Sequence, residues 1–226
     1  MNVDLLITEL EPGGAERCCA ALAEFLHRRK VGVRVISLGP RPSAGKAALV
    51  ARLESEKIPV HFLNATRRTP PWTVRKRLMA LVSTRVPDVA QGFLWHANWM
   101  GGSVYPQLLV PFFAGVRVKE PRQWRAWLSR GWIQRSKKII CVSQDVADWC
   151  HRVEGAPLSK LVVIPNGITL REDESLTSDP RFSTTDRILL FVGRLVKQKG
   201  IDGLMSHAQR LLEELPEHRL VFLGDG

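Results

Sequence analysis

The sequence predicts an α/β protein: a Rossmann-like parallel sheet with flanking helices, followed by the start of a second Rossmann-like domain. Three observations favour this fold class. Short apolar runs, typical of buried strands, alternate with helical patterns along the chain. The spacing of this alternation is typical of βαβ units, whose right-handed crossovers build a parallel sheet. A polar stretch without apolar periodicity then separates the first series of elements from a second one.

The elements of the first domain follow from this pattern. The run from Val3 to Ile7 predicts a buried first strand, and a helical pattern follows it only after a turn. Later apolar runs predict further strands, and the periodic segments between them predict helices. Strands are expected at 3–8, 31–38, 58–63, 88–94, 109–114 and 138–142. Helices are expected at 14–29, 44–56, 73–84, 121–135 and 144–152.

The composition changes between Pro165 and Asp186, where the chain becomes acidic, is enriched in Ser and Thr and loses its apolar periodicity. Such a segment is typical of an interdomain linker. We therefore expect a first domain, a linker and a second domain, at 1–170, 171–186 and 187–226. In the second domain we expect a strand, a helix and a strand, at 187–192, 199–214 and 219–223. A single βαβ unit leaves its edges and faces largely bare, which predicts that this domain is incomplete.

The totals are those of a soluble globular protein. The chain has 226 residues, 45% of them hydrophobic and 24% charged. No apolar run approaches the roughly 18 residues that a membrane span needs, and the start does not resemble a signal peptide. The four cysteines form neither a CxxC pair nor a disulfide framework, which favours a reducing, cytoplasmic location.

The net charge of +11 predicts an anionic partner. Nucleic acid, an acidic lipid surface and phosphorylated substrates are the candidates. The sequence contains no zinc-finger spacing, no RNP-like strand and no basic zipper, so nucleic acid is not expected.

Two loops are candidates for an anionic ligand. The strand at 188–192 ends in a turn at Gly193 and is followed by Arg194 and Lys199, just before a helix. Two cations at the carboxyl end of a strand suit a diphosphate, although a solvated basic turn is the alternative. Gly13 and Gly14 follow the first strand at a helix amino end, where free backbone amides favour phosphate. A simple strand-to-helix turn would explain these glycines equally well.

Both loops resemble motifs of the family 4 glycosyltransferases, which have the two-domain GT-B fold. Residues 191–200 resemble the GR-x-x-x-x-KG signature that opens the donor-binding domain of that family, and GGAER at 13–17 resembles its first loop. Three more segments match in the same order along nearly the whole chain, at 96–98, 141–144 and 163–168.

The resemblance implies a hexosyltransferase-type enzyme of glycan biosynthesis. Such an enzyme moves a sugar from a nucleotide-diphosphate-sugar donor to a hydroxyl acceptor, a glycan or a lipid-linked molecule, and retains the anomeric configuration. Arg194 and Lys199 would bind the donor diphosphate, and the amides of Gly13 and Gly14 would face the same diphosphate. No metal and no other cofactor is expected, because these side chains replace the cation.

His96 and Arg117 are the candidate catalytic residues. His96 follows a strand at the ligand-binding edge and could orient a sugar hydroxyl, with a hydrogen-bonded structural histidine as the equal alternative. The family often carries a histidine after the next strand, and this sequence has Arg117 there. Glu120 is a weaker candidate and is expected to pair with a nearby arginine.

The helix at 121–135 interleaves tryptophans and arginines. Such a helix can lie at a membrane interface beside anionic lipid, which would place the protein peripherally on the inner face of the membrane. Packing of Trp124, Trp127 and Trp132 on the sheet is the favoured alternative.

The resemblance also raises rival interpretations. In the family the second domain is longer and carries a Glu-x7-Glu motif that this sequence lacks, so we expect a chain truncated in that domain and inactive by itself. The rival from another class is a non-catalytic binding module, or pseudo-enzyme, that holds an acceptor or a membrane surface. A dinucleotide-dependent oxidoreductase is disfavoured because the first loop lacks G-x-G-x-x-G.

Overall fold

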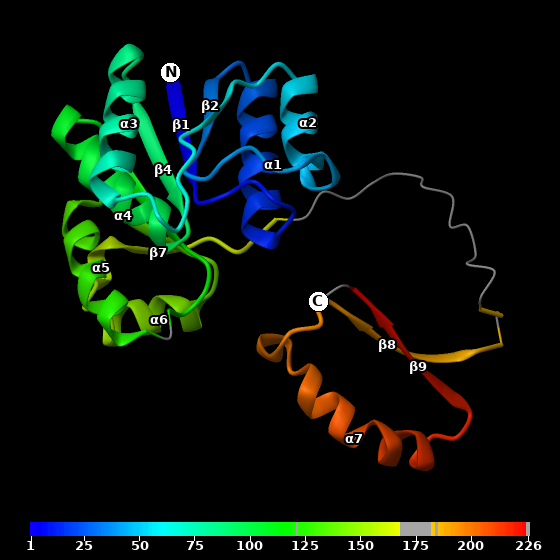
Figure 1. Ribbon diagram of the computed structural model, residues 1–226. Coiled ribbons are helices and arrows are strands. Elements are labelled where there is room, and N and C mark those ends of the chain that lie inside the picture. Colours follow the sequence, from blue (N-terminus) through cyan, green and yellow to red (C-terminus); the bar gives the residue numbers. More distant parts are fainter. Residues whose placement is uncertain (121, 168–181, 184, 225–226) are drawn as a thin grey trace. The chain divides into compact units, whose positions relative to one another are not determined.

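The computed structural model describes residues 1–120, 122–167, 182–183 and 185–224 (Figure 1). They belong to two compact units, Met1–Thr169 and Leu170–Gly226, which we describe separately. The predicted fold class is confirmed, because a parallel sheet with flanking helices forms the first unit and a second parallel pair of strands follows. Most of the expected linker at 171–186 lies outside the described residues.

The described residues of the first unit form a sheet of seven strands. They are β1 (Asn2–Ile7), β2 (Gly32–Ser37), β3 (Val60–Phe62), β4 (Val89–Phe93), β5 (Phe112–Val116), β6 (Lys138–Cys141) and β7 (Leu161–Val163). All neighbouring strands are parallel, in the order β3-β2-β1-β4-β5-β6-β7. The order reverses between β1 and β4, and ligands of open α/β sheets bind beyond the carboxyl ends of the strands at such a point.

In the described part of this unit, six α-helices flank the sheet. They are α1 (Gly14–Arg28), α2 (Ala48–Ser55), α3 (Pro71–Thr84), α4 (Trp95–Val104), α5 (Gln123–Arg135) and α6 (Gln144–Arg152). Short 3-10 turns lie at Ala44–Lys46, Tyr105–Leu108 and Leu158–Lys160. Figure 1 shows α1 and α2 on one side of β1 and β2, with α3 and α4 on the other. Accordingly, Leu5 and Ile7 belong to the core beneath α1 and α2, whereas Leu6 belongs to the core beneath α3 and α4.

Three parts of the first unit differ from the sequence-based expectation. Helix α4 and strand β7 were not predicted, and β5 begins at Phe112 instead of residue 109. Leu109 has a left-handed backbone, with φ at 59°, and Pro111 has no amide hydrogen to donate to a sheet, so the strand forms only after them. Helix α4 lacks a clear apolar stripe and forms through its contacts with β4, β5 and α5.

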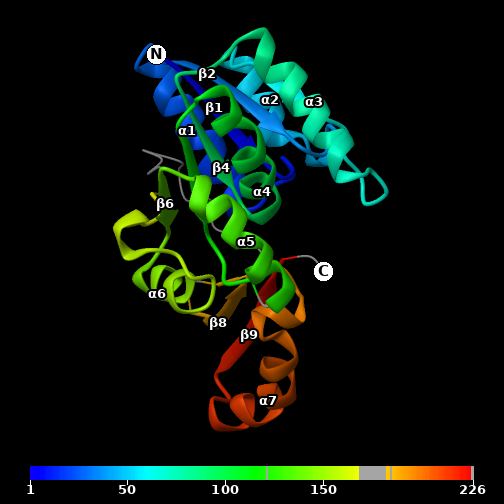
Figure 2. The same cartoon turned by 90° about the vertical axis from the view of Figure 1, so that its left-hand side faces the viewer.

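Helix α5 corrects the expectation that all its tryptophans pack on the sheet. Trp132 is buried, as expected, but Trp124 and Trp127 are 57% and 66% exposed. Figure 2 shows α5 along the side of the first unit, next to α4. No helix of the described residues is long and apolar enough to cross a membrane.

The second unit consists of β8 (Arg187–Val192), a 3-10 turn at Lys197–Lys199, α7 (Ile201–Glu214) and β9 (His218–Leu223). Strands β8 and β9 pair in parallel, as predicted for one βαβ unit. Within its described residues no side chain is fully buried, and Leu190, Val192 and Met205 are more than half exposed.

A buried ion pair ties β1 to β2. Arg34 donates from Nε and Nη2 to the two carboxylate oxygens of Asp4, over 2.6 and 2.8 Å, and Nη2 also donates to the carbonyl of Arg85. The hydroxyl of Tyr105 donates to Asp4 over 3.0 Å. Burial raises the pKa of Tyr105 well above its usual value, and the nearby Asp4 carboxylate raises it further. Asp4 therefore accepts three of the four hydrogen bonds of this group.

We expect Asp4→Ala to lower the free energy of unfolding by about 3–5 kcal/mol, because it leaves the Arg34 guanidinium buried without its carboxylate. Chemical denaturation of the purified chain measures this loss. Glu54→Ala is the matched control, since it removes an equally bidentate pair with Arg41 that is exposed, and it should change stability little. Equal losses in the two variants would contradict the assignment.

Candidate functional site

The carboxyl edge of β1, β4 and β5 carries four of the six residues predicted for the site. Gly13 and Gly14 follow β1, His96 follows β4, and Arg117 follows β5. These three strands are neighbours in the sheet, with β4 in the middle. The structure therefore brings these residues to one edge, at the point where the strand order reverses.

The side chain of Asn98 fixes the distance between two of these loops. It is buried, donates from Nδ2 to the carbonyl of Gly115 over 2.9 Å, and accepts from the Gly115 amide over 3.1 Å. Gly92 allows this contact, because a Cβ there would lie 2.5 Å from Asn98 Oδ1. Asn98 thus joins the first turns of α4 to β5, and with them the loops of His96 and Arg117.

The turn between β4 and α4 has an unusual backbone. Leu94, the residue before the helix, has φ at 70° and ψ at 164°, a region occupied almost only by glycine. Such a conformation costs on the order of 1–3 kcal/mol and occurs most often at functional sites. It allows the chain to enter α4 within two residues of the strand, so that Trp95 and His96 begin the helix at the edge of the sheet.

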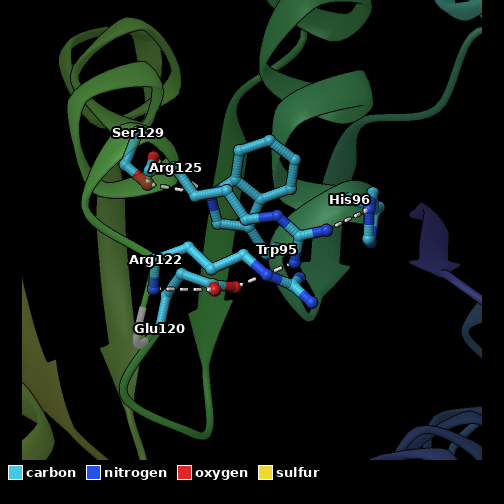
Figure 3. Close-up of polar contacts among 6 residues, drawn as sticks. All are labelled: Trp95, His96, Glu120, Arg122, Arg125 and Ser129. Atoms are coloured by element: carbon cyan, nitrogen blue, oxygen red, sulfur yellow. Dashed lines mark hydrogen bonds and ion pairs between the residues drawn. The ribbon is translucent and has the colours of Figure 1, made fainter.

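Arg125 of α5 connects this turn with the loop after β5 (Figure 3). Its guanidinium donates to Glu120 over 2.9 Å, contacts His96 Nε2 at 3.3 Å, and lies 4.9 Å from the ring centroid of Trp95. The carboxylate of Glu120 also accepts from the Arg122 amide over 3.2 Å. The expected pairing of Glu120 with a nearby arginine is confirmed. The sequence did not reveal Arg125, because its contacts depend on how α5 is rotated against α4.

The indole of Trp95 holds the two helices together. Its Nε1 donates to the hydroxyl of Ser129 over 3.0 Å, and its ring stacks on Trp99 at a centroid distance of 5.7 Å. Trp124 approaches the same ring edge-on at 6.1 Å. Trp95 therefore has a structural role that fixes the position of the neighbouring His96.

The surroundings of His96 favour its neutral form. Partial burial lowers the pKa of this imidazole, and the guanidinium of Arg125 lowers it further, against the opposite effect of Glu120. A guanidinium has only donors, so the 3.3 Å contact requires His96 Nε2 to accept. The proton is then on Nδ1, which leaves a hydrogen-bond donor for another group.

Arg117 is half-buried, and its guanidinium contacts one residue that follows β7 and one residue at the end of β4. Its Nη1 donates to the side-chain oxygen of Asn166, which follows β7, and its guanidinium lies 4.9 Å from the ring centroid of Phe93. Its buried Nε has no hydrogen-bond partner among the described residues. Asn166 was not a predicted site residue, although it lies in a segment that the sequence singled out. A catalytic role for Arg117 stays a prediction.

The glycine loop differs from a simple open anion site. The carboxylate of Glu16, a buried residue in the first turn of α1, covers Gly13, because a Cβ there would lie 2.2 Å from Glu16 Oε2. Gly14 is exposed, and a Cβ there would meet no described group within 4 Å apart from its chain neighbours and the backbone of α1. Binding of a diphosphate by these amides stays a prediction, and Glu16 is an additional group that the ligand would meet.

A cavity of about 470 Å³ lies beside His96, within the volume range of small-molecule sites. It is bounded by the loops after β1, β2 and β3 and by the first turns of α3 and α4. Apolar groups form most of its wall, and His96 and Thr8 are among its polar residues. The sequence did not predict this cavity.

Arg194 and Lys199 of the second unit follow β8. Both are exposed, and neither forms an ion pair or side-chain hydrogen bond with another described residue. The Gly193 amide donates to the carbonyl of Leu223 over 3.0 Å, so the carboxyl ends of β8 and β9 lie side by side. Lys199 lies in a 3-10 turn, and α7 begins only at Ile201. Their predicted role toward a diphosphate stays a prediction.

No group of three His, Cys, Asp or Glu side chains within the described ranges could hold a metal ion. The expectation of a reaction without a metal cofactor is not tested by this finding.

Two family descriptions match the sequence. The sequence model of Glycosyltransferase Family 4 matches residues 12–172, and that of Glycosyl transferases group 1 matches residues 173–226. Glycogen synthase of Mycobacterium tuberculosis is 25% identical over 151 residues, which cover 62% of this chain. The match spans only 36% of the glycogen synthase.

Solved structures share the fold. Anabaena HepE in complex with UDP and glucose superimposes with a TM-score of 0.76 at 19% identity, covering 99% of this chain and 61% of HepE. The lipopolysaccharide outer core galactosyltransferase WaaB in its apo form gives a TM-score of 0.65 at 13% identity, covering 100% of this chain and 68% of WaaB.

We expect His96 to titrate below its ordinary pKa of 6.5 and to carry its proton on Nδ1 in the neutral form. Nitrogen-15 NMR of the imidazole across a pH series measures both. Arg125→Gln should raise the pKa of His96, because a cation is removed while Glu120 remains. Arg130→Gln, on the exposed side of α5, is the control and should leave the titration unchanged. A wild-type His96 protonated on Nε2 would contradict the assignment.

Proposed function

Because this chain belongs to Glycosyltransferase Family 4 and has the GT-B type of fold, we propose that the whole protein transfers a sugar from a nucleotide-diphosphate-sugar donor to a hydroxyl acceptor. In this reaction the acceptor oxygen bonds to the anomeric carbon, the bond from that carbon to the diphosphate breaks, and the hydroxyl proton is released. Retention of the anomeric configuration is part of the proposal.

The donor part of the proposal is supported by the exposed cations after β8. Arg194 and Lys199 are available to a diphosphate, since no described acidic side chain pairs with them. Charge-assisted hydrogen bonds from these groups would stabilise the negative charge that grows on the leaving diphosphate. Such stabilisation requires no metal ion. HepE, which shares the fold, was solved with UDP and with UDP-glucose.

The acceptor part is supported by the position of His96 on the cavity. A neutral imidazole with Nδ1–H can donate to a hydroxyl oxygen and orient it. Arg117 would support the same edge through its contact with Asn166, and Gly13 and Gly14 would offer backbone amides beside it. We assign His96 the role of orienting the acceptor or the donor sugar.

Arg194→Ala in the whole protein should weaken nucleotide-diphosphate binding by ~1.5–3 kcal/mol, the range for a hydrogen bond to a charged group. Arg194→Lys should restore only part of the affinity, because the forked geometry is lost. Calorimetric titration with UDP, GDP and ADP measures these changes and identifies the preferred nucleotide.

Arg210→Ala is the matched control, because Arg210 lies on α7 and pairs, among the described residues, with Glu214 over 3.0 Å. It should bind nucleotide diphosphates as the wild type does. Equal affinities of Arg194→Ala and Arg210→Ala would contradict the donor assignment. They would favour the rival function, a non-catalytic module that holds an acceptor or a membrane surface.

We further propose that the protein is cytoplasmic and contacts an anionic membrane through the outer face of α5. Trp124 and Trp127 lie on this face, and Arg130 and Arg135 are exposed beside them. The sequence from 121 to 138 contains no acidic residue. Indole rings favour the interfacial region, and cations favour the negative surface of such a membrane.

Trp124→Ala combined with Trp127→Ala should reduce binding to vesicles of phosphatidylglycerol about threefold or more, because two interfacial indoles are lost. Sedimentation with vesicles at low and high salt measures the effect, and vesicles of phosphatidylcholine should bind less. Trp72→Ala is the control, since Trp72 is also exposed, at 72%, but lies on α3. A similar loss in both proteins would contradict the assignment of this face.

A further inference from the structure

We propose that the cavity beside His96 binds an acceptor with an alkyl group next to the hydroxyl that reacts, and not an acceptor made of sugar alone. The inference rests on the proposed transferase function, and it narrows the acceptor to an amphipathic class. Three observations support it: the apolar lining of the cavity, the unpaired hydroxyl of Thr8, and the position of His96 in the cavity wall.

The wall of the cavity is largely hydrocarbon. Leu38 and Pro40 follow β2, and Ala65 follows β3. Val74 of α3 and Trp99 and Met100 of α4 complete this surface. Leu38, Val74 and Met100 are also members of the hydrophobic core, so their positions are fixed by packing beneath the cavity. A preformed apolar wall of this kind favours the burial of an apolar group.

A few polar groups occupy the cavity at its β1 side and around its rim. Thr8, directly after β1, has a buried hydroxyl with no hydrogen-bond partner among the described residues. An unpaired buried hydroxyl is costly, and a ligand hydroxyl would satisfy it. His96 lines the same cavity and has Nδ1–H free of the contact with Arg125. Glu9 and Arg67 are the charged residues of the cavity, and both are exposed.

This distribution selects against an acceptor made of sugar alone. Each sugar hydroxyl that enters must give up its hydrogen bonds to water, and the side chains of Leu38, Val74 and Met100 cannot replace them. An alkyl group loses no hydrogen bond in the same place and gains contact with the wall. Thr66 and Thr69 also line the cavity, but their hydroxyls hydrogen-bond to each other over 3.1 Å. Thr8 and His96 then remain for one or two ligand hydroxyls.

The test uses the present chain and three soluble probes: methyl β-D-glucoside, octyl β-D-glucoside below its micellar concentration, and cellobiose. Calorimetric titration should show octyl glucoside binding about tenfold or more tightly than methyl glucoside, because the octyl chain buries additional methylene groups. Cellobiose should bind no better than methyl glucoside. Equal affinity of the octyl and methyl glucosides, or tighter binding of cellobiose, overturns the proposal.

A matched pair of variants locates the site. Pro40→Glu places a charge in the apolar wall at an exposed position, and it should weaken octyl glucoside binding about fivefold or more. Pro157→Glu makes the same change at an exposed residue outside the cavity and should leave binding intact. Circular dichroism verifies that both variants fold.

Two other results have distinct meanings. Loss of octyl glucoside binding in the variant without Trp124 and Trp127, with Pro40→Glu unaffected, would show that the probe adsorbs to the outer face of α5, and it overturns the proposal. The donor assignment is tested separately, through Arg194 in the second unit. Failure of nucleotide binding together with intact octyl glucoside binding would therefore contradict the transferase function and leave an amphipathic-ligand site in place.

Discussion

The candidate site depends on the buried side-chain amide of Asn98. Both of its polar atoms are committed to the backbone of Gly115, so α4 can lie against β5 in only one position. This contact requires the close approach that Gly92 permits. Because the loops of His96 and Arg117 leave the sheet from these same elements, their spacing is fixed by the two hydrogen bonds between the Asn98 side chain and the Gly115 backbone. Sites supported in this way hold their geometry without a bound ligand.

The cationic side chains of this protein fall into two groups, those paired with a carboxylate and those exposed without an ion pair. In the first unit Arg34 and Arg125 are each neutralised by a carboxylate and serve the architecture. The exposed Arg194, Lys199 and Arg130 form no ion pair within the described part of the chain. Net charge alone therefore does not identify a binding surface. Among the described residues, exposed cations without an ion pair include those of the loop after β8 and of the outer side of α5, and also Arg67 and Arg68 after β3.

Much of the fold could be predicted from sequence because buried parallel strands are continuous apolar runs. Strands β1, β2, β3, β4, β6, β8 and β9 were all expected, and their observed bounds lie within a few residues of the predicted ones. Helix α4 was not, because it has two adjacent glycines and little periodicity. Its stability comes from residues distant in sequence: the ring of Phe112 fills the space at Gly101, and Trp132 lies against Gly102. Short-range patterns carry no signal of such contacts.

Part of the candidate site could also be predicted from sequence, because recognising the strands locates the residues that follow them. A residue after a strand lies at the ligand-binding edge, so His96 and Arg117 could be placed once the strands were recognised. Arg125 and Asn166 could not, because each acts from another element and depends on the packing of side chains. Glu16 is an instructive case. Its place in the first turn of α1 is evident from sequence, but its carboxylate over Gly13 is a tertiary feature.

The close packing of α4 also changes how tolerance to substitution should be interpreted in this region. Gly92, Gly101 and Gly115 have no room for even one methyl group, although none of them lines the cavity beside His96. With the role proposed above for His96, a survey of all single substitutions would record these glycines and His96 as equally intolerant when growth or turnover is scored. Scoring the yield of folded protein would separate them, because the glycines would fail and His96 would pass. On α4, His96 and the closely packed Gly101 are fewer than two helical turns apart, so the two kinds of residue cannot be separated by position alone.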